Sequence, residues 1–72
     1  MNINRTIFYV PCHDGSKVSM TFVRGNYGKL LGKIIVKHPD GEITYGYAEK
    51  FFKAFLIEGA NHGGYIWQHS KP

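Results

Sequence analysis

The chain has 72 residues, of which nine are Lys or Arg, five are Asp or Glu and 43% are hydrophobic. A chain this short buries only about 60% of the surface that it exposes when unfolded, so we expect one small domain over residues 1–72 without a deep, water-free active site. The formal charge of +4 and the lone Cys12, which cannot form an internal disulfide, favour a binding protein of the reducing cytoplasm over a disulfide scaffold.

Two strands and a tight turn are predicted at the start of the chain. Residues 5–10 are rich in β-branched and aromatic side chains, which favour a strand. Apolar residues alternate over 17–23, with Val18, Met20 and Phe22 on one side, as in a half-buried strand. Between the strands, the Asp and Gly of residues 12–15 have the chemistry of a hairpin turn, because Asp bonds its own backbone and Gly accepts a left-handed conformation.

The third strand is predicted over residues 29–37, after a Gly-rich turn at 25–28. Its apolar residues Leu30, Ile34 and Val36 face one way. The other face carries three lysines and two apolar residues: Lys29, Lys33, Lys37, Leu31 and Ile35. A second covering layer or a partner would explain the two apolar residues on the lysine side.

The fourth strand is predicted over residues 42–47, after a second Asp-Gly turn at 38–41. Ile43, Tyr45 and Tyr47 share one of its faces. After Gly46 the apolar period becomes that of a helix.

The helix has an apolar stripe at positions 48, 51, 52, 55 and 56, so Phe51, Phe52 and Phe55 are expected to cover one face of the sheet. Gly59 is expected to be its left-handed C-terminal cap. Residues 65–69 are expected to form a short final strand. The apolar-rich stretch 51–57 is far shorter than the roughly 18 residues that span a bilayer, so no membrane segment is expected.

These elements predict an α+β fold, with an antiparallel β-meander of about four strands packed against one C-terminal helix and a short final strand. Successive turns of a meander alternate between the two ends of the sheet. Residues that are far apart in the sequence are therefore expected to meet at each end.

One end of the sheet is expected to gather the single cysteine and three histidines: Cys12, His13, His38 and His62. Thiolate and imidazole are zinc ligands, but no spacing matches a zinc motif, so turn and surface roles are favoured. We assign no metal and no cofactor, although the sequence leaves a metal site of these four residues open. Cys12 and His13 are neighbours, which point to opposite faces of a strand, so no catalytic pair is assigned.

The other end is expected to gather bases and aromatic residues. Residues 1–41 hold six bases and two acids, so the positive charge is concentrated there. Lys and Arg attract phosphate and carboxylate alike, and exposed rings stack on bases or anchor protein interfaces. The candidate binding residues are Arg24, Asn26, Tyr27, Lys29, Lys33, Lys37 and Tyr47.

The sequence therefore favours a non-enzymatic protein that docks a basic, aromatic surface onto an acidic partner protein. It would act as an inhibitor or adaptor, with a nucleic-acid-processing machine among the partners considered. Direct binding of a single strand or a nucleic-acid backbone is one alternative, and a Cys/His metal-site protein is another. A homodimer is also considered, because Leu31, Ile35 and Ile57 lie outside the main apolar patterns.

Overall fold

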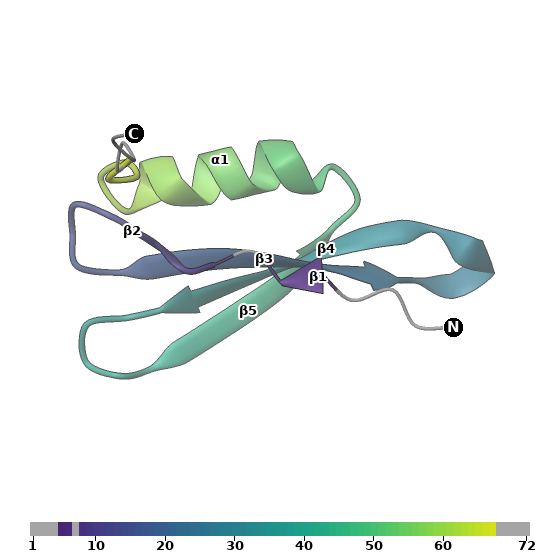
Figure 1. Ribbon diagram of the computed structural model, residues 1–72, viewed down its shortest axis with the longest axis horizontal. Helices are drawn as coiled ribbons and strands as arrows, with labels where there is room; N and C mark the ends of the chain where they lie inside the picture. The colour runs from purple at the N-terminus through teal and green to yellow at the C-terminus, as the bar shows by residue number, and fades with distance from the viewer. Residues whose placement is uncertain (1–4, 7, 68–72) are drawn as a thin grey trace, which may run out of the picture.

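The computed structural model of the protein describes residues 5–6 and 8–67. Its elements are β1 (Arg5–Thr6), β2 (Val10–Pro11), β3 (Lys17–Arg24), the 3-10 helix η1 (Asn26–Gly28), β4 (Leu30–Lys37), β5 (Ile43–Ala48) and α1 (Phe51–Asn61). The strands form one antiparallel sheet in the order β1-β3-β4-β5, β2 also pairs with β3, and α1 lies across one face (Figure 1). The predicted α+β meander is confirmed.

The predicted first strand is present as two short strands that follow one another along β3. Arg5 pairs with Phe22, whereas Val10 pairs with Val18. The register therefore shifts by one residue between the two pairs, as at a β-bulge.

The two Asp-Gly hairpin turns are built alike, as predicted. The Asp14 carboxylate accepts a hydrogen bond from the Ser16 N–H at 2.8 Å, and Asp40 accepts the equivalent bond from Glu42 at 2.9 Å. The glycine after each aspartate has a φ of 93° in the first turn and 94° in the second. Only glycine adopts this conformation without strain, so both hairpins are fixed locally by their sequence.

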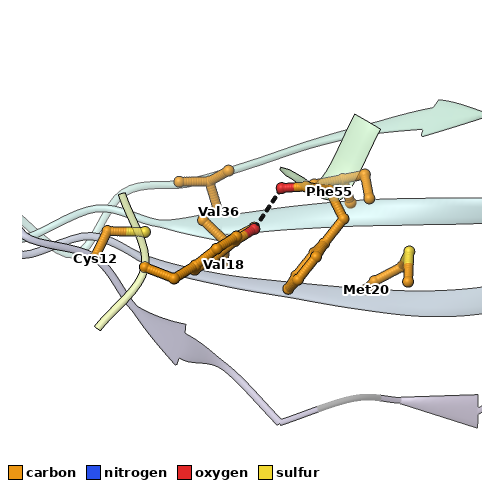
Figure 2. Close-up of a cluster of buried hydrophobic side chains, with 7 residues drawn as sticks. Cys12, Val18, Met20, Val36 and Phe55 are labelled. Carbon is orange, nitrogen blue, oxygen red and sulfur yellow. Dashed lines mark hydrogen bonds between the residues drawn. The ribbon is translucent and has the colours of Figure 1, made fainter. Parts of the chain in front are cut away.

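The core lies between α1 and the face of the sheet that it covers (Figure 2). Its buried apolar side chains are Cys12, Val18, Met20, Ile34, Val36, Phe55 and Tyr65. The alternating patterns of the strands predicted four of these correctly. Tyr65 reaches the core from beyond α1: its ring stacks on Phe55 with centroids 4.6 Å apart, and its hydroxyl donates to the Phe55 carbonyl oxygen at 2.6 Å.

The stripe that α1 presents to the sheet differs from the predicted one. Phe51 is half-buried and Phe55 is buried, but Phe52 and Leu56 are 63% and 60% exposed. Ala48 ends β5 instead of joining the helix. Because a helix turns by about 100° per residue, Phe52 lies at the flank of the stripe, where it contacts Phe22 edge-to-face with centroids 5.9 Å apart.

The predicted role of Gly59 is wrong, because this residue lies inside α1. A Cβ at this position would lie 2.1 Å from Cε2 of Tyr65, so the glycine permits the close approach of the Tyr65 ring. The helix ends at Asn61 and is followed by Gly63 and Gly64, with φ of 84° and 93°; the Gly64 N–H donates to the Gly59 carbonyl oxygen at 2.8 Å. These two residues supply the left-handed termination.

The segment after α1 returns beside β2. Cys12 and Tyr65 form a single bridge, and the Ile66 N–H donates to the Pro11 carbonyl oxygen at 2.8 Å. Of the final strand predicted over residues 65–69, the described residues form this single bridge at Tyr65. Residues 68–69 lie outside the described residues. Across the described part of the chain, no helix is long and apolar enough to cross a membrane.

Candidate binding face

One face of the sheet is covered by α1, and no element of the described residues covers the other, which we refer to as the open face (Figure 1). The register of the three long strands determines its composition. It consists of Lys17, Ser19, Thr21 and Val23 from β3, Leu31, Lys33, Ile35 and Lys37 from β4, and Ile43, Tyr45 and Tyr47 from β5. Ser19 is buried among these residues, and the others are half-buried or exposed. These strand positions include three lysines and no carboxylate, so the open face is positively charged.

Lys33 lies among the exposed aromatic residues of the open face. It pairs with Tyr47 across β4 and β5, and its Nζ lies 4.4 Å from the centre of the Tyr45 ring and 6.0 Å from that of Tyr47. The two rings meet edge-to-face, with centroids 6.2 Å apart. Because the face of an aromatic ring attracts a cation, the ammonium group is held within the aromatic patch.

A hollow of about 360 Å³ lies between the two hairpin turns, at one end of the open face. It is lined by Gly15, Lys17, Lys37, His38, Pro39 and Gly41. The His38 ring is directed to the covered face, where its Nε2 lies 3.1 Å from the Thr44 hydroxyl. Lys17 and Lys37 are direct partners across β3 and β4, so the hollow is bordered by two lysines. Charged donors of this kind suit a carboxylate or a phosphate group.

The structure brings together part of the predicted binding site. Lys33, Lys37 and Tyr47 share the open face, as expected for two of the lysines from the alternation in β4. Lys29 lies just before β4, where its Nζ forms a salt bridge with Glu49 Oε1 at 3.0 Å. The charge of Lys29 is therefore matched by a neighbouring carboxylate.

The other predicted residues lie at the turn between β3 and β4, which projects past the start of α1 (Figure 1). Asn26 opens η1, and Tyr27 is fully exposed with a φ of 59°. Arg24 is exposed and has the same strand parity as Phe22, so it does not belong to the open face. These three residues stand apart from Lys33.

Sequence reasoning missed Lys17 and Tyr45 as candidate binding residues. Lys17 pairs with Lys37, and Tyr45 lies under the ammonium group of Lys33. The signal was present, because Lys17 alternates with Val18 and Tyr45 shares a strand face with Tyr47. Only the register between strands shows that these residues meet on one face.

An acid–histidine cluster joins the end of α1 to the first hairpin. His62 Nδ1 lies 2.7 Å from Asp14 Oδ2, and His62 Nε2 lies 3.1 Å from Glu58 Oε1. The hydrogen bond to Asp14, followed by that to Glu58, raises the pKa of His62. The Ser16 backbone N–H is the main cause of a lowered pKa at Asp14. The cluster therefore favours a charged imidazolium between two carboxylates.

The predicted gathering of cysteine and histidines occurs in part. The His38 and His62 rings are 5.8 Å apart, whereas Cys12 is buried in the core, and this burial is the main cause of a raised thiol pKa. Over residues 5–6 and 8–67, no group of three or more His, Cys, Asp or Glu is arranged to hold a metal ion. Both ring nitrogens of His62 are instead bonded to carboxylates.

A second hollow, of about 350 Å³, lies on the covered face between α1 and β5. Its β5 side is lined by residues 44–48, of which Thr44, Gly46 and Ala48 face the helix with small side chains. Glu58 supplies the one carboxylate of its lining.

No protein-family model, curated protein or solved structure matches the chain. Its function is therefore inferred from its own residues, and the open face is the feature that carries the inference.

Proposed function

We propose that this protein is a small non-enzymatic binding protein that docks its open face onto an acidic surface of a partner protein, as an inhibitor or adaptor. The observation that carries the proposal is the position of Lys33 between Tyr45 and Tyr47 on an uncovered face. Lys17 and Lys37 extend the same positive surface. The lysines attract carboxylates over a distance, and the tyrosines supply the anchoring contacts typical of protein interfaces.

Two features favour a protein over a nucleic acid as the ligand. The ammonium group of Lys33 lies over the Tyr45 ring, and the Tyr45 and Tyr47 rings are inclined at 85°, so the pair does not present two parallel stacking platforms. The open face also carries aliphatic residues such as Ile35 and Ile43 beside the rings. A mixed apolar centre with charged groups around it is typical of a protein interface.

The hollow between the two hairpin turns is suited to receiving an acidic side chain of the partner. Lys17 and Lys37 lie side by side in its lining, and ammonium groups attract carboxylates. The His38 ring is directed to the covered face, where its Nε2 lies 3.1 Å from the Thr44 hydroxyl.

The proposal is tested with variants that change the open face and with matched controls on the helix. Lys37→Gln removes an exposed charge from the open face, and Lys53→Gln removes one from α1. Tyr47→Ser and Phe52→Ser similarly truncate exposed aromatic residues on the two surfaces. Affinity capture from nuclease-treated lysate of the source cells would identify acidic proteins whose retention depends on the open face.

With the purified partner, we expect Lys37→Gln to weaken binding by about two- to fivefold and Tyr47→Ser by about tenfold. Lys53→Gln and Phe52→Ser should leave the affinity unchanged. Equal losses for the two pairs of variants would contradict the proposal. Two results together would identify nucleic acid, and not an acidic protein, as the ligand. Proteins would be retained only when nuclease is omitted, and a purified oligonucleotide would bind with an affinity that falls steeply with salt.

A further inference from the structure

The free edge of β5 lacks the features that protect sheet edges. β5 is six residues long, contains no charged residue and no proline, and pairs with β4 in an unbroken register. Its residues Ile43 to Tyr47 are all exposed. In the described part of the chain, β5 pairs on one side only, and its other side faces solvent (Figure 1). An exposed, uncharged edge without a bulge or proline is a surface for pairing with another strand.

The opposite edge of the sheet is protected. There the register shifts by one residue between β1 and β2, and Pro11 supplies no N–H. The Pro11 carbonyl oxygen already accepts the Ile66 N–H at 2.8 Å. Bulges, proline and covering segments are the usual devices that prevent edge pairing, so among the residues that the structure describes the β5 edge is the one left available.

The ladder shows which backbone groups of β5 are unpaired. The His38 N–H donates to the Glu42 carbonyl oxygen at 2.8 Å, so this residue pair is of the hydrogen-bonded type. Hydrogen-bonded and non-hydrogen-bonded pairs alternate along an antiparallel ladder. The residues at 44, 46 and 48 therefore bond β4, whereas Ile43, Tyr45 and Tyr47 direct their N–H and C=O groups toward the free edge.

We propose that the β5 edge binds the β5 edge of a second copy of this chain in antiparallel orientation. The unpaired N–H and C=O groups of one copy must then face those of the other. Tyr45 and Tyr47 of one copy therefore lie opposite Tyr45 or Tyr47 of the second copy. Residues of equal parity share a face. Both copies of α1 consequently lie on the same side of the joined sheet, and the two open faces become one continuous surface.

Charge complementarity selects the register and favours a second copy over an unrelated strand. When the twofold axis passes through Gly46, Glu42, which directly precedes β5 in one copy, comes near Lys50, two residues past the end of β5 in the other. The same pair recurs at the opposite end. Both residues are exposed, and within the described residues neither side chain forms a salt bridge. A twofold axis at Tyr45 would place Glu42 opposite Ala48 and leave its charge unmatched. Glu42 and Lys50 thus flank β5 with opposite charges, each four residues from Gly46.

In this register Gly46 meets Gly46 of the second copy at a non-hydrogen-bonded position, where two strands approach most closely. Tyr45 of each copy lies opposite Tyr47 of the other, which brings four tyrosines together on the joined open face. Cross-strand aromatic pairs stabilise such a ladder. The joined face would also carry Lys17, Lys33 and Lys37 twice. The dimer would therefore enlarge the proposed binding surface, but its formation does not depend on the acidic partner.

Sedimentation of the purified full chain, alone and from micromolar to millimolar concentration, tests the proposal. We expect a concentration-dependent dimer. Tyr45→Pro removes an N–H that points to the free edge and makes no hydrogen bond to β4. This variant should therefore be a folded monomer, with folding checked by circular dichroism. Persistence of the dimer in folded Tyr45→Pro, or a wild-type chain that stays monomeric throughout, would overturn the proposal.

Charge reversal tests the register. Glu42→Lys and Lys50→Glu each turn two attractive pairs into repulsive ones, and each should raise the dimer dissociation constant by about tenfold. The double variant should restore the wild-type value, and Lys53→Glu should leave it unchanged. Failure of the double variant to recover would refute this pairing. Because no partner protein is present, a monomer that still bound an acidic protein would overturn the dimer and leave the proposed function standing.

Discussion

His62 is hydrogen-bonded to Asp14, a residue 48 positions earlier in the chain, with Nδ1 and Oδ2 2.7 Å apart. The other ring nitrogen lies 3.1 Å from Glu58 Oε1, one turn back along α1. The carboxylates favour the charged imidazole, so the pKa of His62 is raised, first by Asp14. The Asp14–His62 contact links the end of α1 to the first hairpin. Because the imidazole titrates, the stability that this contact contributes depends on pH.

We expect the stability of the fold to fall as the pH rises through neutrality. A histidine whose folded pKa is raised stabilises the protein fully below its unfolded pKa of about 6.5, and this contribution is lost as the pH rises through the folded value. The pKa of Asp14 is lowered, so its contribution is present above its unfolded value of about 3.9 and is lost as the pH falls through the folded value. The cluster is therefore strongest at about pH 5–6.

Thermal unfolding of the wild-type chain and of His62→Gln checks this expectation. The difference in Tm between them should be largest near about pH 5.5 and should shrink above about pH 7, because only the wild type loses an imidazolium there. A Tm difference that stays constant with pH would show that His62 acts by packing alone.

The matched turns allow the contribution of the Asp14–His62 contact to be separated from that of the turn. Asp14→Ala and Asp40→Ala each remove the carboxylate that accepts a backbone N–H two residues on. Only Asp14→Ala also removes a contact with His62, so it should lower Tm more than Asp40→Ala at about pH 6. In a His62→Gln background the gap between the two substitutions should narrow to the contribution of the Ser16 side chain, which also hydrogen-bonds Asp14. A gap as wide as in the wild-type background would contradict this assignment.

The sheet could be predicted from the sequence because its signals are local. Alternation over β3 and β4 identifies Val18, Met20, Ile34 and Val36 as core, and each Asp-Gly turn fixes its hairpin without help from distant residues. The stripe of α1 could not be read in the same way. A Cβ at Gly32 would lie 2.1 Å from Cβ of Phe51, so the helix begins in close contact with β4. That long-range contact sets the rotation of the helix and leaves Phe52 at its flank.

The open face could be predicted only strand by strand. Alternation placed Lys33 and Lys37 on one side of β4 and placed Tyr45 and Tyr47 on one side of β5. The contact of Lys33 with Tyr45 depends on the register between these strands, which is set by the length of the turn at 38–41. Similarly, nothing in the local sequence pairs Lys29 with Glu49, because they approach only when the fold is complete.

Gly59→Ala should destabilise the fold although alanine is the better helix former by about 1 kcal/mol. The added Cβ would lie 2.1 Å from the Tyr65 ring, which could withdraw only by disturbing its hydrogen bond to the Phe55 carbonyl oxygen and its stacking on Phe55. Overpacking of this kind costs about 1–3 kcal/mol, which urea denaturation would measure. In a Tyr65→Ala background the same substitution should become stabilising. An increase in the free energy of unfolding for Gly59→Ala alone would contradict the close approach of Tyr65.

Two buried serines should respond in opposite ways to replacement by alanine. Ser16 and Ser19 are 1% and 0% exposed. The Ser16 side chain hydrogen-bonds Asp14 and helps to lower the pKa of that carboxyl, whereas none of the described residues bonds the buried Ser19 hydroxyl. Ser16→Ala should therefore lower the free energy of unfolding. Ser19→Ala should raise it by up to about 1 kcal/mol, because an unpaired buried hydroxyl is costly. Urea denaturation at about pH 6 measures the free energy of unfolding of both variants. If Ser19→Ala lost as much stability as Ser16→Ala, the Ser19 hydroxyl would have a hydrogen-bond partner in solution, and the prediction would be wrong.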